Sequence, residues 1–224
     1  EQAEPWVSYL ARNAHMLQQG KFAADVAYFY GEEAPLAGLY GEGSTLPKDL
    51  PAGYGFDFAN SDVILNKLTV ANGGLETASG MHYRLLYLGG SSHKMTLPVL
   101  RKLQALVTAG AVVVGDRPSG SPSLADNAAE FASIADTLWG AGGSATEKAV
   151  GKGKVIFGHD VNKALAALGV QRDFDYEKPE PGSEVMFLHR RLAKGELYFL
   201  SNRMDGQQTI NATFRVTGKR PELW

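Results

Sequence analysis

The sequence predicts an α/β fold with a mostly parallel sheet and flanking helices, followed by a short antiparallel β segment. The apolar run Leu85–Leu88 ends in two glycines, which is typical of a central strand buried on both faces. An amphipathic helix is expected between Thr96 and Gly110, and a second apolar run, 111–116, begins at once. Strand, crossover helix and strand form a βαβ unit, whose two strands pair in parallel.

The crossover helix carries its own boundary signals. Thr96 is a suitable N-cap, Pro98 falls in the first turn, and Gly110 is suited to end the helix. The apolar residues that share one face of this helix are Leu97, Leu100, Leu103 and Val107.

Ligands of open α/β sheets bind at the carboxyl ends of parallel strands, so residues 89–94 and 116–121 are the first places to expect a site. Ser91 and Ser92 follow the central strand, where hydrolases can carry a nucleophile. The spacing does not match Gly-x-Ser-x-Gly, and a loop with polar caps is the favoured interpretation. A small serine hydrolase using Ser91 or Ser92 stays open as an alternative.

Before this unit, periodicity and turn residues predict a helix at 5–19 and a strand at 22–30. A long Gly/Pro/Leu-rich loop follows at 34–55, and loops of this kind are often functional. A short helix is expected at 61–68, and two short strands are expected at 69–70 and 75–77.

After the unit, the pattern predicts a helix at 124–139, a glycine-rich mobile stretch at 140–153 and a buried strand at 154–158. A helix capped by Asp160 is expected at 161–168, and a polar linker at 174–183. Three further β-rich runs predict an antiparallel meander. They lie at 184–192, 195–202 and 208–217. The chain therefore divides into residues 1–21, 22–173 and 184–224.

Composition excludes several classes of function. The chain has 224 residues, a net charge of −2 and no cysteine, so neither a basic nucleic-acid surface nor thiolate chemistry is expected. No apolar run is long enough to cross a bilayer, so no membrane partner is expected. No glycine-rich loop has the context of a nucleotide site, and no histidine pair has metal spacing, so no cofactor and no metal are predicted. His189 and Arg191 share one face of a strand, as a structural pair.

The best candidate for ligand contact is a polar and aromatic cluster. Asp57, Asn60 and Asp62 lie close to Tyr54 in the sequence, among phenylalanines. Carboxylates, amides and aromatic rings together suit a carbohydrate site, although capping and loop packing explain the same residues. Asp57 and Asp62 are not expected to form the carboxyl pair of a glycosidase, because no helix or strand period aligns them. No catalytic residue is therefore assigned.

Four stretches, in this order and spacing, resemble the middle portion of glycoside hydrolase family 106, the α-L-rhamnosidases. The resemblance spans essentially the whole chain. The stretches are residues 6–32 with Ala24-Asp25-Val26-Ala27-Tyr28-Phe29-Tyr30-Gly31-Glu32, residues 55–62, residues 83–100, and residues 188–224 ending in Lys219-Arg220-Pro221-Glu222-Leu223-Trp224.

The resemblance implies a place within a larger enzyme. Family members are long, multidomain bacterial enzymes, often exported to the periplasm or secreted, whose N-terminal (β/α)8 barrel carries the catalytic carboxylates and works by inversion. Residues 1–21 would be the helix that ends that barrel. Residues 22–173 would form a class I glutamine amidotransferase-like, flavodoxin-like three-layer domain, and 184–224 the entry to β-rich modules. No cysteine follows the central strand, so amidotransferase chemistry is not expected.

The first residue is Glu1 rather than Met, and the chain stops at Trp224 directly after a strand-like run, so we expect part of a longer protein. The leading hypothesis is a non-catalytic accessory domain of a family 106-like α-L-rhamnosidase, inactive alone, that supports the barrel and borders the sugar site. Its partners would be the other domains of the parent glycosidase, a rhamnose-containing saccharide and other copies of itself in a homo-oligomer. The alternative is a stand-alone carbohydrate-binding or oligomerisation module.

Overall fold

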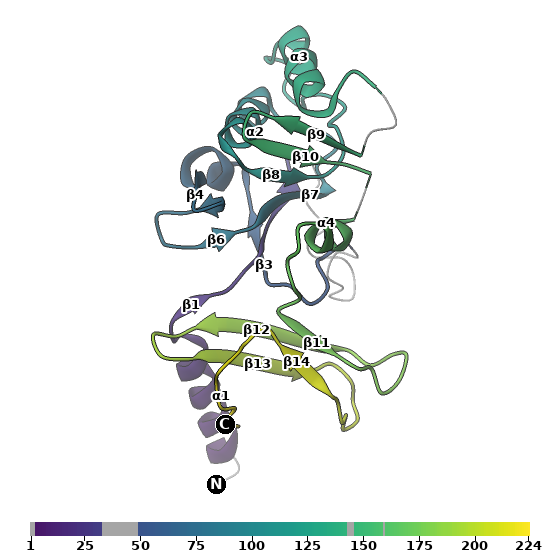
Figure 1. The fold of residues 1–224 in the computed structure, drawn as a ribbon. Coiled ribbons are helices and arrows are strands. Elements are labelled where there is room, and N and C mark those ends of the chain that lie inside the picture. Colours follow the sequence, from purple (N-terminus) through teal and green to yellow (C-terminus); the bar gives the residue numbers. More distant parts are fainter. Residues whose placement is uncertain (1–2, 33–48, 143–145, 159) are drawn as a thin grey trace. The chain divides into compact units, whose positions relative to one another are not determined.

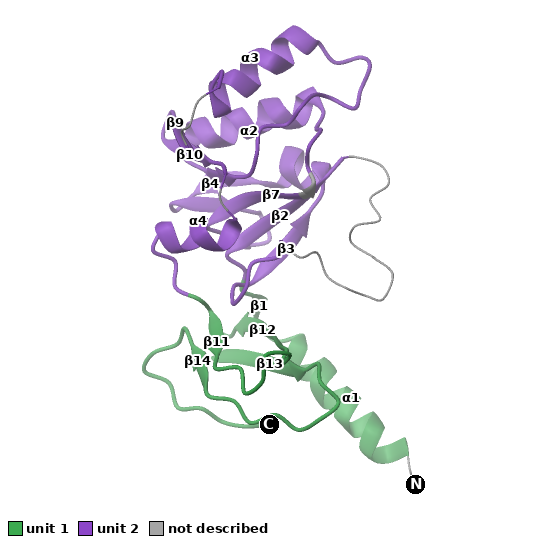
Figure 2. Cartoon of the chain, turned by 90° about the vertical axis from the view of Figure 1, so that its right-hand side faces the viewer, with its two compact units in different colours: residues 1–23, 172–224 green, residues 24–171 purple. Residues whose placement is uncertain are grey.

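The computed structural model describes residues 3–32, 49–142, 146–158 and 160–224. The chain forms two compact units, each coloured separately in Figure 2. Unit 2 is continuous and comprises residues 24–171, whereas unit 1 combines residues 1–23 with residues 172–224. Residues 1–21 and 184–224, predicted as separate parts, thus lie in the same unit. The assignment of residues 1–21 to a preceding barrel stays a prediction.

Figure 1 labels most of the elements of both units. Unit 2 contains β2 (Val26–Gly31), β3 (Phe56–Ala59), the π-helical turn η2 (Val63–Lys67), β4 (Thr69–Ala71), β5 (Gly74–Glu76), β6 (His82–Tyr83), β7 (Leu85–Ser91), α2 (Leu97–Ala109), β8 (Val112–Val114), α3 (Ala128–Trp139), β9 (Glu147–Val150), β10 (Gly153–Ile156) and α4 (Val161–Ala167). Unit 1 contains α1 (Ala3–Leu17), β1 (Lys21–Phe22), β11 (Phe174–Tyr176), β12 (Val185–Arg191), β13 (Glu196–Asn202) and β14 (Ala212–Phe214).

The main sheet of unit 2 has six strands in the order β3-β2-β7-β8-β10-β9. β2 and β7 pair in parallel with Val26 opposite Leu85, and β7 pairs in parallel with β8 with Leu86 opposite Val113. The expected strand, helix and strand around α2 is therefore confirmed. β3 and β10 extend the parallel pairing on either side, and β9 closes the edge in antiparallel orientation.

Both faces of the sheet are covered by helices. Alternate residues of a strand point to opposite faces, so Tyr28 and Tyr87 lie on one face and Phe29 and Leu86 on the other. The first face packs against α4, whose Val161 is buried in the same cluster as both tyrosines. α2 contacts β8 and β10 and is itself packed by α3. The apolar positions predicted for α2, among them Leu100 and Leu103, are buried.

The predicted fold class was wrong. The structure is a mixed α/β fold with several sheets, and the flavodoxin-like, amidotransferase-like assignment is not supported. Besides the main sheet there are three smaller sheets with the orders β1-β12-β13, β11-β14 and β4-β5-β6, and their strands pair antiparallel. The reason is connection length: a parallel crossover needs about a dozen residues, whereas the turns at Asn72-Gly73 and Gly151-Lys152 join their strands as hairpins.

Two local predictions also differ from the structure. The glycine-rich stretch 140–153, expected to be mobile, includes the ordered strand β9, which pairs with β10. The third strand of the predicted meander, β14, pairs with β11 and not with β13. β11 falls within the stretch that we expected to be a linker, so its pairing partner was missed.

Two carboxylates cap the start of α2. Thr96 occupies the N-cap position, but its side chain makes no capping bond. Glu32 Oε2 accepts a hydrogen bond from the Thr96 backbone N–H at 2.7 Å, and Asp126 Oδ2 accepts one from the Leu97 N–H at 2.7 Å. Ser61 Oγ also donates to Glu32, at 2.7 Å. Negative charge at a helix N-terminus is favourable, so this contact fastens α2 to the carboxyl ends of β2 and β3.

Unit 1 has a small and largely polar interior. Among its described residues, those classed as buried are Ala23, Asp173, Phe174, Ser183 and His189. Phe174 is in ring contact with neighbouring aromatic side chains on β11, β12 and β14. α1, in contrast, has no buried residue. Unit 1 therefore depends on hydrogen bonds and partly exposed aromatic contacts more than on apolar burial.

Gly89 gives a test of the packing around β7. A Cβ at Gly89 would overlap the Tyr28 ring, so Gly89→Ala must displace that ring and its hydrogen bonds. We expect the free energy of unfolding to fall by about 1–3 kcal/mol in chemical denaturation. Gly120→Ala is the matched control, because a Cβ at Gly120 meets nothing within 4 Å. Equal stability of the two variants would contradict this account.

Candidate functional site

The carboxyl ends of β7 and β8 are joined to each other. Ser119 N–H donates to the His93 carbonyl at 2.7 Å, and Met95 N–H donates to the Gly120 carbonyl at 3.2 Å. Trp139 Nε1 donates to the Gly115 carbonyl at 2.9 Å. In the region where a ligand was expected first, backbone groups of residues 93–95 therefore bond to those of residues 119–120.

Ser92 is buried and points into the protein. Its Oγ lies 2.7 Å from the Gly89 carbonyl and 3.0 Å from the Phe29 carbonyl, both acceptors for its single proton. A nucleophilic serine needs a base that accepts its proton and an open approach for the substrate. Ser92 has carbonyls in place of the base, which favours the predicted polar cap. The side chain of Ser91 lies outside the described residues.

A carboxylate with two phenols lies on the α4 face of the sheet. Tyr28 donates to Asp49 at 2.9 Å, and Tyr87 donates to the same side chain at 3.2 Å. Burial raises the pKa of both tyrosines, and the nearby Asp49 raises it further. Both phenols are therefore protonated donors that hold the carboxylate. No local pattern predicted this contact, because Asp49 lies in the long loop and both tyrosines were predicted as strand residues.

Asp57 lies on β3 and accepts a hydrogen bond from the Tyr83 hydroxyl at 3.0 Å. Burial raises the pKa of Asp57, and the hydrogen bond from Tyr83 lowers it in part. Burial also raises the pKa of Tyr83, as does the nearby carboxylate. Asp57 is thus a predicted site residue that combines partial burial with a raised pKa.

The other three predicted site residues have local structural contacts. Tyr54 is buried and donates to the Val170 carbonyl at 3.0 Å. Asn60 Oδ1 accepts from the Val63 N–H at 2.9 Å and so caps the π-helical turn, and Asp62 accepts from Asn66 at 2.8 Å. Tyr54 precedes β3, whereas Asn60 and Asp62 follow it, so they lie at opposite ends of that strand.

The aromatic rings and the Asp57 carboxylate face in different directions. Phe58 contacts Tyr28 edge-on with ring centroids 5.3 Å apart, on the face that packs against α4. Asp57, the neighbouring strand residue, points to the opposite face and reaches Tyr83. The combination of ring and carboxylate that suggested a carbohydrate site is thus divided between two faces of the sheet.

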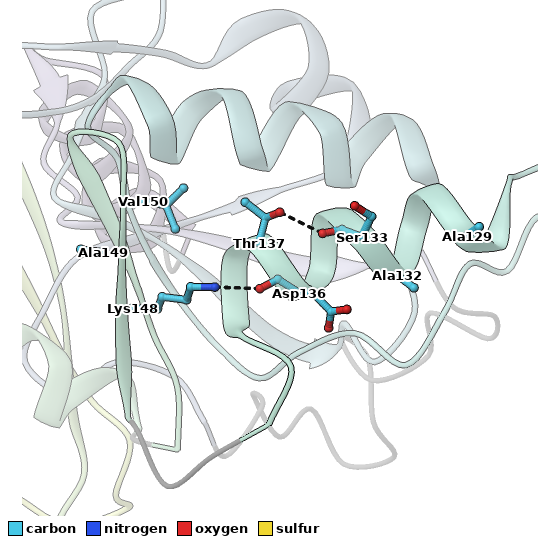
Figure 3. A pocket seen from close by; sticks show the side chains of 8 residues that line it. All are labelled: Ala129, Ala132, Ser133, Asp136, Thr137, Lys148, Ala149 and Val150. Atoms are coloured by element: carbon cyan, nitrogen blue, oxygen red, sulfur yellow. Dashed lines mark hydrogen bonds between the residues drawn. The ribbon is translucent and has the colours of Figure 1, made fainter.

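An open hollow of about 810 Å³ lies between α3 and β9 (Figure 3). Small side chains line most of it, including Ala129, Ala132 and Ala149. Lys148 Nζ donates to the Asp136 carbonyl at 2.8 Å across the hollow. Asp136 is the one carboxylate among its lining residues, so the hollow does not offer the two facing carboxyls that glycoside hydrolysis uses.

A cluster of titratable groups lies in unit 1, around His189. Its Nδ1 lies 2.7 Å from Asp173 Oδ2 and its Nε2 lies 2.9 Å from Glu196 Oε2. Burial opposes the charge of Asp173, but hydrogen bonds from His189 and Tyr198 and the charges of His189 and Arg215 together lower the pKa of Asp173. The predicted pairing of His189 with Arg191 overlooked these carboxylates, because Asp173 is far away in the sequence.

Within the part of the chain that the structure describes, no group of three or more His, Asp or Glu side chains could hold a metal ion. In the same residues, no helix has the length and apolar character that a bilayer crossing requires.

Comparisons with known proteins identify a family for the chain. The sequence model of glycoside hydrolase family 106, described as alpha-L-rhamnosidase, matches residues 1–224. The structure matches that of a rhamnosidase from Novosphingobium sp. PP1Y with a TM-score of 0.90 and 44% identity, covering 100% of this chain and 21% of that one. A protein of Formosa agariphila named "Putative beta-glucuronidase" is 34% identical over 100% of this chain and 18% of its own length. The chain thus spans about a fifth of the length of these relatives.

Tyr83→Phe tests the electrostatics of Asp57. The variant removes the hydroxyl donor and keeps the ring, so the pKa of Asp57 should rise further, as read from the carboxyl signal in NMR titration. Because folding raises this pKa, the contribution of Asp57 to stability is present below the ordinary aspartate value and is lost as the pH rises through the folded-state pKa. Tyr30→Phe, in the neighbouring strand, is the control and should leave the titration unchanged. An unchanged Asp57 titration in Tyr83→Phe would contradict the assignment.

Proposed function

Because the chain belongs to glycoside hydrolase family 106, the alpha-L-rhamnosidases, we propose that it is a non-catalytic accessory portion of a larger enzyme of that class. Its role is to support the catalytic part of the parent enzyme. The main support for the proposal is the share of a solved relative that the chain covers. The whole chain matches 21% of a rhamnosidase chain at 44% identity, so most of that rhamnosidase lies outside the matched portion.

The carboxylates of the chain support a structural role. Glu32 and Asp126 cap α2, Asp49 holds two phenols, and Asp173 is bound by His189 and Tyr198. Glycoside hydrolysis needs one carboxyl as acid and another as base or nucleophile, both free to reach the substrate. Carboxylates that accept hydrogen bonds from structural donors are poorly placed for that work, which favours a catalytic pair located elsewhere in the parent enzyme.

The exposed face of α1 supports a contact with the rest of the parent enzyme. Trp6, Val7, Tyr9 and Leu10 are 61%, 58%, 49% and 46% exposed. Neighbouring large apolar side chains with this exposure are uncommon on a self-sufficient domain and mark an interaction surface. We assign this surface to the catalytic portion of the parent.

We also propose that edge strand β3 lies next to the bound sugar. Asp57, Asn60 and Asp62 lie on and just after the edge strand β3, where another domain could bring a saccharide to them. In this proposal they border the site for a rhamnose-containing saccharide and do not bind it alone, because the ring of Phe58, next to Asp57 on β3, faces the other side of the sheet.

An activity and binding assay separates the hypotheses. The purified chain should not hydrolyse an aryl α-L-rhamnoside and should show no saturable binding of rhamnose. Turnover would refute the non-catalytic role. Saturable rhamnose binding without turnover would favour the stand-alone carbohydrate-binding module, and labelling of Ser91 or Ser92 by a fluorophosphonate probe would favour the serine hydrolase.

The α1 surface gives a second test. Trp6→Ala combined with Leu10→Ala should leave the free energy of unfolding of this chain within about 0.5 kcal/mol, because both side chains are already exposed. The same change in a protein that also carries the catalytic portion should destabilise it by on the order of 2–4 kcal/mol, the cost of truncating buried side chains. Arg12→Ala on the same helix is the control. Equal losses in both contexts would show that α1 has no such partner.

A further inference from the structure

The turn between β4 and β5 in unit 2 contains an exposed asparagine–glycine pair. Ala71 pairs with Gly74, so Asn72 and Gly73 are the two residues that reverse the chain. Both have a positive φ, 51° at Asn72 and 76° at Gly73, as a two-residue type I′ turn requires. Asn72 is the only residue other than glycine that has a positive φ within the described part of the chain.

An asparagine followed by glycine can react with its own backbone. The glycine nitrogen attacks the side-chain carbon Cγ, so that an N–Cγ bond forms. The Cγ–Nδ2 bond then breaks, and the amide leaves as ammonia with the proton of the glycine N–H. Water opens the resulting succinimide at either carbonyl, which gives aspartate or isoaspartate. A side chain on the attacking residue would hinder the first step, and glycine has none.

The structure leaves the approach to Gly73 open. A Cβ built at Gly73 would meet nothing within 4 Å, and both residues of the turn are exposed to solvent. Water can therefore reach the bond that forms and the ring that must be hydrolysed.

Glu76 holds the reacting amide in place. Asn72 Nδ2 donates to Glu76 Oε1 at 2.8 Å, from the turn to the last residue of β5. Hydrogen bonds to a carboxylate are stronger than those between neutral groups. Ring closure must change the side-chain torsions of Asn72, which this hydrogen bond restrains. The contact with Glu76 therefore opposes the reaction that the sequence favours.

Two other exposed asparagines have the same kind of contact. Asn66 Nδ2 donates to Asp62 at 2.8 Å, and Asn211 Nδ2 donates to Glu177 at 2.9 Å. A lysine follows the first and an alanine follows the second, so a Cβ lies next to the attacking nitrogen in both cases. Asn72 is the only asparagine in the sequence that is followed by glycine.

We propose that Asn72 is a deamidation site of the folded chain, at which Glu76 slows the conversion to aspartate or isoaspartate. The modification needs only water as co-reactant. It is independent of the role proposed above for the chain in a larger enzyme.

Either product changes the hairpin. An aspartate at position 72 replaces the Nδ2 donor by a second carboxylate beside Glu76, and the two like charges repel. An isoaspartate adds an atom to the backbone of a turn that fits two ordinary residues, so the pairing of Ala71 with Gly74 is disturbed. Leu75 has no exposed surface and anchors the middle of β5, so we expect the change to stay at the turn end of the hairpin.

Peptide mapping by mass spectrometry tests the site. During prolonged incubation of the purified chain in mildly alkaline ¹⁸O-labelled water, Asn72 should take up the heavy oxygen, whereas Asn66 and Asn211 in the same sample should keep their amides. An intact Asn72, or equal conversion of the three asparagines, would overturn the proposal.

Variants of the neighbouring strand residues isolate the role of Glu76. Glu76→Ala should speed the conversion of Asn72 by about fivefold, the factor that corresponds to one hydrogen bond. Glu76→Gln keeps an oxygen that accepts from Nδ2, so its rate should stay within about twofold of the unchanged chain. Thr69→Ala is the matched control, because Thr69 lies opposite Glu76 and contacts its carbonyl but not the Asn72 amide. Equal rates in Glu76→Ala and Thr69→Ala would show that Glu76 does not slow the reaction.

Asn72→Asp reproduces the change in charge at the turn. Amide hydrogen exchange of residues 71–74 should be faster in this variant than in the unchanged chain. Asn66→Asp introduces a carboxylate beside Asp62 instead and should leave exchange at residues 71–74 unchanged. If Asn72→Asp did not alter that exchange, the effect of the modification on the hairpin would be refuted.

Discussion

The need to cover both faces of β2 and β7 governs the structure of unit 2. These adjacent strands lie inside the main sheet and carry residues such as Val26 and Leu86 with no exposed surface. α4 covers one face, while α2 contacts strands of the same sheet and is fixed at its start by Glu32 and Asp126. Glu32 and Asp126 thus serve to hold α2 in place.

Unit 1 obeys a different constraint. Its few buried side chains include Asp173, Ser183 and His189, and among the described residues no buried side-chain nitrogen or oxygen lacks a partner. A polar interior of this kind is stable only while every donor meets an acceptor.

Local signals in the sequence predicted elements better than architecture. α2, with Pro98 near its start and Gly110 at its end, and the strands β7 and β8 were predicted within a few residues. The presence of several sheets was not predicted. Short hairpins such as β4–β5 form separate small sheets, and strands this short leave only a weak apolar pattern in the sequence. Asp57 was singled out, but its partner Tyr83 and the contact of Asp173 with His189 depend on pairing across distant segments, which no local period reveals.

The division of unit 1 into two separated stretches has a consequence for biosynthesis. β1 pairs with β12, and all of unit 2 is translated between these two strands. Unit 2 is continuous, so it can fold on the ribosome as soon as it emerges. The N-terminal strand β1 must wait for its late partner β12. A premature stop after α4 would therefore leave the sheet of unit 2 without a partner strand for β1.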